Sequence, residues 1–212
     1  CAICKWIYKV GKKLWDGSLC FRAASVVCGN TFLLLGLFLA VMLMVPHGNW
    51  DNRYALMGAL ALTALFAIGS GPRASHRLEP GAFGPYYIFF MGFICYAFLS
   101  SLDWKPSIRF VGFHLAAFLL AVLVVSSVKK YEQLRLLVVL AVLGLTIAAL
   151  YGCYQGVTGV KVVANQQDLS VNAGMPGRVY SFFDNPNNFA ELLVMLMPFT
   201  YALFLNAKSW RG

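Results

Sequence analysis

Residues 133–155 read QLRLLVVLAVLGLTIAALYGCYQ, an apolar run in which Arg135 is the only charged residue. The run is apolar on all sides, and its hydrophobic residues do not alternate with polar ones as in a half-buried strand. About 20 such residues suffice for an α-helix to cross the hydrocarbon core of a bilayer. The stretch therefore predicts a membrane-spanning helix rather than a strand of a barrel.

Further runs of this kind recur along the 212-residue chain, which is 60% hydrophobic and only 12% charged. Charged residues make up about a quarter of an ordinary soluble domain, so that class is excluded. The expected spans are residues 26–45, 54–70, 85–101, 108–127, 133–155 and 188–206. The predicted fold is an all-α, polytopic bundle of about six transmembrane helices.

The predicted spans divide the chain into four parts. Residues 1–25 form a basic segment in which aromatic residues alternate with lysines, typical of a helix lying on an anionic leaflet. Residues 26–155 form a five-span bundle, and residues 156–187 form the only long polar loop. Residues 188–212 contain the sixth span and the end of the chain.

The net charge of +9 first suggests nucleic-acid binding, but the distribution of charge indicates membrane topology instead. Twelve of the 17 Lys and Arg residues fall on one side of the six spans. The other five are Arg53, Lys105, Arg109, Lys161 and Arg178. The positive-inside rule then puts both termini in the cytoplasm and the 156–187 loop outside. We expect membrane lipids as partners and no nucleic acid.

Polar residues inside the spans are few. Asn30 and Thr31 in the first span are expected to hydrogen-bond to another helix, and the small residues of the second span to permit close helix packing. An intramembrane histidine such as His114 is a functional hypothesis by default, although a neutral ring bonded to a neighbouring helix is the favoured interpretation. The Cys1-x-x-Cys4 pair has no second pair, so a zinc site is not predicted.

The end of the long loop reads GRVYSFFDNPNNFAE, residues 177–191. Asn185 is a good helix N-cap and Pro186 suits the first helical position. Backbone N–H groups at a helix start favour an anion, and the planar guanidinium of Arg178 can bind phosphate oxygens with two bonds. The stretch therefore predicts a diphosphate site at the membrane border. The alternative is a re-entrant turn in which Arg178 pairs with Asp184 or Glu191.

This stretch resembles the O-antigen ligase and O-antigen polymerase family of bacterial membrane proteins. The similarity covers about twenty residues and is carried by the following pattern. It runs Arg178-x-x-Ser181-x-Phe183-x-Asn185-Pro186-Asn187-x-x-Ala190-x-x-Leu193, followed by Leu196-x-Pro198. The resemblance implies a membrane glycosyltransferase of the C type, and the six spans would correspond to the N-terminal half of that fold.

The resemblance also implies an activity. Such proteins transfer a glycan from undecaprenyl diphosphate to a glycan, lipid or protein acceptor at the outer face of the inner membrane, in lipopolysaccharide and other polysaccharide biosynthesis. No metal, nucleotide sugar or other cofactor is implied, because the lipid diphosphate is the leaving group. Arg178, with Asn185 and Asn187, would bind the diphosphate and stabilise its developing charge. Tyr180, Ser181 and Glu191 would support them.

The sequence departs from the family pattern in two respects. Asp184 occupies a position where a small residue such as Gly is more usual. The later outer loop of the family, which supplies a histidine proposed to activate the acceptor, would lie beyond Gly212, and neither His47 nor His114 is expected to replace it. The catalytic residues are therefore not identified. The alternative function is a non-catalytic membrane protein, either a transporter or an assembly subunit, that binds an anionic lipid.

Overall fold

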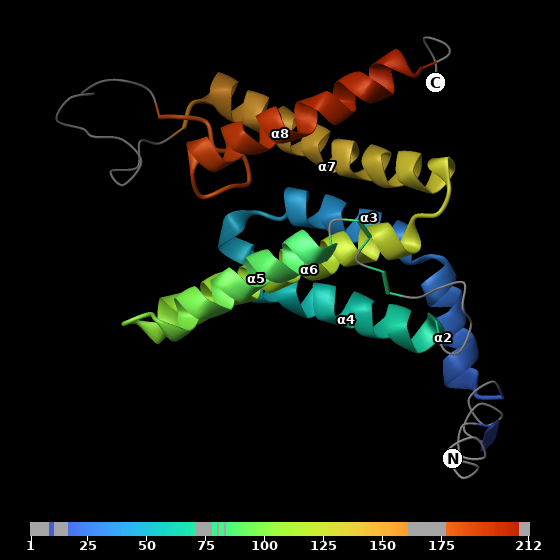
Figure 1. Ribbon diagram of the computed structural model, residues 1–212. Helices are drawn as coiled ribbons and strands as arrows, with labels where there is room; N and C mark the ends of the chain where they lie inside the picture. Colours follow the sequence, from blue (N-terminus) through green and yellow to red (C-terminus); the bar gives the residue numbers. More distant parts are fainter. Residues whose placement is uncertain are drawn as a thin grey trace. The chain divides into compact units, whose positions relative to one another are not determined.

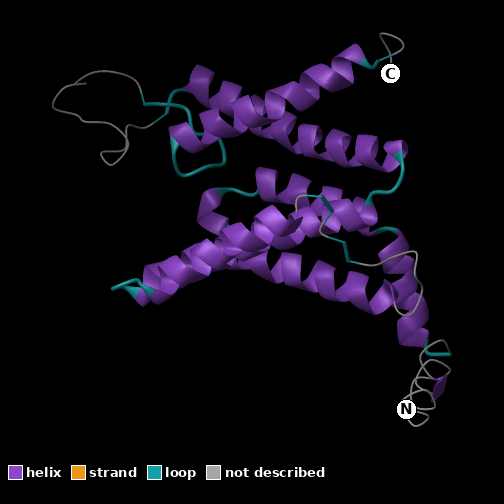
Figure 2. Cartoon of the chain, viewed as in Figure 1, coloured by secondary structure: helices purple, strands orange, loops and turns teal. Residues whose placement is uncertain are grey.

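The computed structural model describes residues 9–10, 17–70, 78–79, 81–82, 84–160 and 177–207. Within these residues the chain is helical and contains no strand (Figure 2), which confirms the all-helical prediction. Its elements are α2 (Leu19–Gly29), α3 (Thr31–Met44), a 3-10 turn at His47–Asn49, α4 (Asn52–Ser70), α5 (Gly84–Leu99), α6 (Trp104–Ser127), α7 (Tyr131–Thr158) and α8 (Pro186–Leu205). Most of the basic segment 1–25 lies outside the described residues, and so does half of the loop 156–187, namely residues 161–176.

The described helices give four or five candidate membrane spans, so the predicted count of six is not confirmed. The stretch Arg53–Ser70 of α4 and the whole of α6, α7 and α8 are long and apolar enough to cross a membrane. The pair formed by α2 and α3 is a fifth candidate if it is one bent span. The helix α5 is apolar but has only 16 residues, fewer than a perpendicular span requires.

The first predicted span is broken in the middle, where α2 and α3 meet at an angle of 66°. Asn30 caps α2, and its side-chain amide donates to the Val26 carbonyl at 2.9 Å. The Thr31 hydroxyl donates to the Val27 carbonyl at 3.0 Å. Thr31 at the start of α3 thus bonds to α2, the helix that directly precedes it, whereas Asn30 bonds back to the helix that it caps and not, as expected, to another one. They satisfy carbonyls of the preceding turn, as side chains near a helix end commonly do.

The chain forms two compact units, and the first contains residues 1–35 and 52–134. Within it α4 packs against α2 and α6, and α6 also packs against α5 (Figure 1). The packing of α2 on α4 is close because Gly69 has no side chain. A Cβ at Gly69 would overlap the Ala24 carbonyl and lie 2.5 Å from the Cβ of Cys28. The prediction that small residues of this span permit close packing is confirmed at Gly69 and at the buried Ala59.

The helices α5 and α6 form a hairpin whose turn is closed by Asp103. This residue caps α6 by accepting the Lys105 N–H at 3.2 Å. Further along α6, a ring nitrogen of His114 lies 2.8 Å from the Phe110 carbonyl of the same helix. The His114 ring also contacts the Phe90 ring of α5 at a centroid distance of 5.6 Å. The expected hydrogen bond from His114 to a neighbouring helix is thus replaced by one within its own helix.

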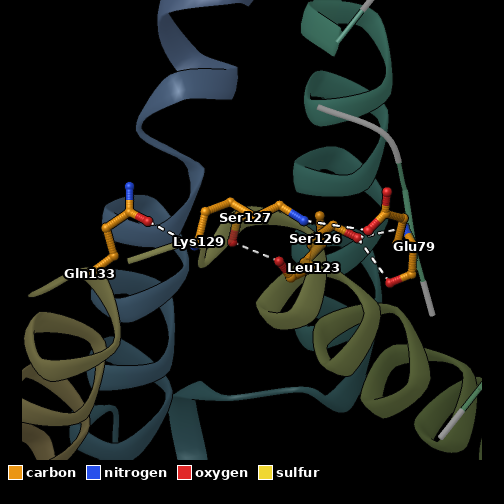
Figure 3. Close-up of polar contacts among 6 residues, drawn as sticks. All are labelled: Glu79, Leu123, Ser126, Ser127, Lys129 and Gln133. Carbon is orange, nitrogen blue, oxygen red and sulfur yellow. Dashed lines mark hydrogen bonds and ion pairs between the residues drawn. The ribbon is translucent and has the colours of Figure 1, made fainter. Parts of the chain in front are cut away.

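A short segment before α5 is fixed to the end of α6, as Figure 3 shows. The Ser126 hydroxyl accepts the Glu79 N–H at 2.8 Å and donates to the Glu79 carbonyl at 3.2 Å. Lys129 forms an ion pair with the Glu79 carboxylate at 3.4 Å. The side chain of Gln133 accepts the backbone N–H groups of Lys129 and Lys130, and so links the end of α6 to the start of α7.

The second unit contains residues 36–51 and 135–212, which include the later part of α3, most of α7, and α8. Gly144 of α7 lies on the backbone of Ala40 in α3, where an added Cβ would be 3.0 Å from the Ala40 oxygen. α8 starts beside the end of α7 and continues as a helix through Pro198 to Leu205 (Figure 1). This unit contains every described residue of the predicted diphosphate site.

Candidate anion-binding site at the start of α8

The start of α8 has the cap that the sequence predicts. Asn185 is extended, with φ −136° and ψ 132°, and its side-chain oxygen accepts the Asn187 N–H at 2.7 Å. Pro186 occupies the first helical position, where a missing N–H costs nothing, and it is buried. Because an N-terminal turn carries a partial positive charge, this end of α8 favours an anion nearby.

Arg178 reaches this first turn. Its Nη2 donates to the side-chain oxygen of Asn187 at 2.8 Å, and both side chains are exposed. The partner of the guanidinium is thus a neutral amide, and not the Glu191 carboxylate considered from the sequence. Close by, an Asp184 carboxylate oxygen accepts the Asn188 side-chain N–H at 3.0 Å. A cation and a helix N-terminus therefore share one exposed surface.

The segment between Arg178 and α8 is fixed through Ser181. This residue has φ 54°, a left-handed conformation that costs a non-glycine residue about 1–3 kcal/mol. Its side chain is buried, with 3% of its surface exposed, and its hydroxyl donates to the Ala148 carbonyl of α7 at 2.6 Å. The Phe183 N–H donates to the Tyr180 carbonyl at 3.0 Å and closes a turn around Ser181.

Gln155 of α7 binds the backbone of the same turn. Its side-chain oxygen accepts the Ser181 N–H at 2.7 Å and the Tyr180 N–H at 3.3 Å. Its side-chain nitrogen donates to the Ser181 carbonyl at 3.2 Å. Gln155 is itself buried, so these three bonds satisfy an amide that would otherwise be costly to place there.

α7 and the start of α8 also approach each other closely, and this contact helps to fix the loop that carries Arg178. Gly152 faces the buried ring of Phe189, and a Cβ at Gly152 would lie 2.9 Å from the Phe189 Cε1 and 3.4 Å from Val179 Cγ1. Any side chain at Gly152 would therefore push Phe189 or the loop away from α7. This contact sets how near the first turn of α8 can come to α7.

Aromatic rings pack around the turn. Phe182 stacks on Tyr151 of α7 with a centroid distance of 4.5 Å and an interplanar angle of 4°. Phe183 stacks on Phe189 at 5.9 Å. The Phe182 carbonyl accepts the His47 N–H of the 3-10 turn at 2.7 Å. These contacts hold the turn against α7, the first turns of α8 and the 3-10 turn, whereas the Arg178 side chain is exposed.

The structure brings together most of the residues that the sequence predicts. Arg178, Asn185 and Asn187 converge at Asn187, whose side-chain oxygen accepts from Arg178 and whose backbone N–H donates to Asn185. Tyr180 and Ser181 hold the loop to α7. Tyr180 does so through its backbone N–H, and Ser181 through its backbone and its hydroxyl. Glu191 lies in the second turn of α8 with an exposed side chain. Its supporting role stays a prediction.

Sequence reasoning missed the residues of α7 that hold the loop, namely Ala148, Gly152 and Gln155. They are spaced by four and three residues, so they lie on one face of the helix. A polar Gln155 on the same face as a small Gly152, at the end of an apolar run, is the signal in the sequence that points to a contact there.

No metal centre is evident in the described part of the chain, which contains no group of three or more His, Cys, Asp or Glu residues close enough to hold an ion. Cys1 and Cys4 lie outside it.

Comparison with known proteins adds no assignment, since no protein-family model, curated protein or solved structure matches this chain. The similarity to O-antigen ligases and polymerases therefore depends on the motif residues alone.

Proposed function

We propose that this protein takes part in glycan transfer from an undecaprenyl-diphosphate carrier to a glycan, lipid or protein acceptor, as O-antigen ligases and polymerases do. The observation that supports the proposal best is the Arg178–Asn187 contact of 2.8 Å at the first turn of α8. It joins a guanidinium and a helix N-terminus, two groups that favour phosphate oxygens, on a loop between two apolar helices.

The chemistry of the leaving group explains why such a site would accelerate transfer. Cleavage of a glycosyl diphosphate places negative charge on the departing diphosphate oxygens. Preorganised cationic and N–H donors at that point stabilise the transition state without reorganising. Arg178 would bind two oxygens of the diphosphate, while its bond to Asn187 keeps the guanidinium oriented toward the α8 terminus.

The membrane location follows from the helices on either side. α7 and α8 are each long and apolar enough to span a bilayer, so the end of α7 and the start of α8, with Arg178, would lie at a membrane border. With the six spans predicted from the sequence, the positive-inside rule favours the outer face for that border and the cytoplasm for both termini, which would correspond to the outer face of the bacterial cytoplasmic membrane for a protein of the proposed class. A lipid-linked glycan carried to this face would present its diphosphate at the depth of Arg178.

The experiment that tests the activity is glycan transfer in membranes of a host strain that lacks its own copy of this gene. Arg178→Lys should lower transfer about tenfold or more, because a point charge cannot replace a bidentate fork. Arg109→Lys is the matched control, since Arg109 is an exposed arginine near the start of α6. Transfer by Arg178→Lys equal to that of the control, at equal protein level in the membrane, would contradict the proposal.

The sidedness can be tested at the two ends of one helix. Val157, which is 89% exposed, lies near the end of α7, and the exposed Lys130 precedes its start. In a cysteine-free background, a membrane-impermeant maleimide applied outside should label Val157→Cys and should leave Lys130→Cys unlabelled until the membrane is permeabilised. The reverse pattern would put Arg178 on the cytoplasmic side and exclude transfer at the outer face.

The second candidate function is a non-catalytic subunit or transporter that binds an anionic lipid. The exposure of Arg178 supports it, because a guanidinium open to the membrane surface also suits a phospholipid headgroup. Binding of phosphatidylglycerol vesicles without any glycan transfer would favour this alternative.

A further inference from the structure

We propose that Gln155 is a positioning residue that holds Arg178 at the start of α8. Among the described residues, Gln155 does not hydrogen-bond to the side chain of any member of the predicted motif. It binds the backbone of the turn from which Arg178 extends. Its relevance to diphosphate binding rests on the function proposed above, whereas its effect on the loop stands on the geometry alone.

The side chain of Gln155 forms hydrogen bonds with the backbone of two successive residues, Tyr180 and Ser181. Its amide accepts the Ser181 N–H at 2.7 Å and donates to the Ser181 carbonyl at 3.2 Å, and also accepts the Tyr180 N–H at 3.3 Å. Both peptide planes that flank Ser181 are thereby fixed relative to α7. An aliphatic side chain of the same size would offer neither the acceptor nor the donor.

Ser181 requires such a restraint. Its φ of 54° is unfavourable for a residue with a Cβ, and strained conformations of this kind persist only where the surroundings over-determine them. The hydroxyl bond from Ser181 to Ala148 fixes the side chain, and the bond from the Phe183 N–H to the Tyr180 carbonyl closes the turn, but neither engages the N–H or the carbonyl of Ser181 in the two peptide planes that flank it. The Gln155 amide supplies the restraint on those planes.

The turn that Gln155 fixes determines the position of Arg178 on one side and that of its partner Asn187 on the other. Toward the N-terminus, Val179 packs on α7, where Cβ atoms at Gly152 and Gly156 would lie 3.4 and 3.8 Å from its methyl groups. Toward the C-terminus, the turn closed by Phe183 leads to the Asn185 cap, which orients Asn187. Arg178 and its partner Asn187 are therefore both placed by the turn that Gln155 fixes.

The loop position can be measured without any ligand. In a cysteine-free background, Gly156→Cys and Val179→Cys should form a disulfide, since a Cβ added at Gly156 would lie 3.8 Å from a Val179 methyl carbon. Gln155→Leu should slow disulfide formation about fivefold or more, as expected from the loss of one to three net hydrogen bonds. An unchanged rate would overturn the inference.

Gln133→Leu is the matched control. Gln133 is also a glutamine of α7, and its side-chain oxygen also accepts two backbone N–H groups, those of Lys129 and Lys130. Its substitution removes comparable hydrogen bonds at the opposite end of the same helix. We expect the 156–179 disulfide to form at the parental rate in this variant. An equal slowing in both variants would assign the effect to general destabilisation and overturn the inference.

Gln155→Glu guards against a variant that fails to fold, because it is nearly isosteric. A carboxylate still accepts the two N–H groups but cannot donate to the Ser181 carbonyl, whereas a protonated carboxyl can. Disulfide formation in Gln155→Glu, divided by the parental rate at the same pH, should therefore rise as the pH falls. A pH-independent ratio equal to one would count against the positioning role.

The link to function is tested by rescue. Binding of undecaprenyl diphosphate in lipid nanodiscs should weaken about fivefold or more in Gln155→Leu, and prolonged oxidation of the 156–179 cysteine pair should restore it. Reduction of the disulfide should remove the gain. If disulfide formation slows while undecaprenyl diphosphate binding stays unchanged, the positioning of the loop stands and the proposed diphosphate site fails.

Discussion

Two segments of this protein are held to the end of a helix by the same kind of contact, and they differ in what they present. Ser126 near the end of α6 binds the N–H and the carbonyl of Glu79, and Gln155 near the end of α7 binds the N–H and the carbonyl of Ser181. We call these the Glu79 contact and the Ser181 contact. In each, one side chain replaces a missing backbone partner.

The two contacts differ in the backbone strain of the residue beside them and in the partner of the neighbouring cation. Near the Glu79 contact the left-handed residue is Gly81, with φ 66°, which bears no steric cost. At the Ser181 contact the left-handed residue is a serine. Lys129 beside the first contact is paired with a carboxylate, whereas Arg178 beside the second bonds to a neutral amide. The Glu79 contact closes a connection between two helices, whereas the Ser181 contact fixes the turn next to Arg178, the residue that we propose binds an anion.

The largest effect is expected at Ser181. Ser181→Val places a β-branched residue at φ 54° and removes the bond to Ala148, so it should cost about 2–4 kcal/mol. Ser181→Gly should be nearly neutral, because relief of strain offsets the lost bond. Thermal unfolding in detergent and trypsin cleavage after Arg178 would measure both variants. Equal behaviour of the two variants would mean that the backbone strain is unimportant.

Gly152→Ala should destabilise the start of α8 by about 1–3 kcal/mol, because its Cβ would lie 2.9 Å from the Phe189 ring. The control is Gly92→Ala in α5, where nothing lies within 4 Å of an added Cβ. Thermal unfolding midpoints of the two variants should differ, with the Gly92 variant at or above the parent. A Gly152 variant as stable as the control would argue against the close approach of α7 and α8.

Ser126→Ala tests the Glu79 contact and should cost about 1–2 kcal/mol, since it leaves the Glu79 N–H without its acceptor. Hydrogen exchange at the Glu79 amide should become faster. Ser25→Ala, which removes an exposed bond to the Arg22 carbonyl, serves as the control and should change little. Glycan transfer should be unaffected by either substitution. A loss of transfer in Ser126→Ala would show that the two contacts are not functionally distinct.

The smallest effect is expected at the ion pair. Lys129→Gln should change stability by less than about 1 kcal/mol, because the two side chains of the Lys129–Glu79 pair are 42% and 58% exposed. The midpoint of thermal unfolding should therefore depend little on this substitution, and less still at high salt. A large, salt-dependent loss would make the charge, rather than the Ser126 hydroxyl, the main component of the Glu79 contact.

The sequence predicted what depends on local pattern. The apolar runs predicted helices, and the Asn185–Pro186 pair predicted where α8 begins, because capping is a local property. The bend at Asn30 was missed, since an apolar run does not reveal that its polar residues bond backward and end a helix. Gln155 was missed because its partners lie about 26 residues further along the chain, a separation that hydrophobic periodicity cannot detect.

We propose above all that Arg178 and the start of α8 bind a diphosphate. Equilibrium binding of undecaprenyl diphosphate and of undecaprenyl monophosphate to the protein in nanodiscs, for the parent and for Arg178→Lys, tests it most directly. We predict that the parent prefers the diphosphate and that the substitution weakens diphosphate binding about tenfold or more, with little change for the monophosphate. Equal affinity of parent and variant for undecaprenyl diphosphate would contradict the claim.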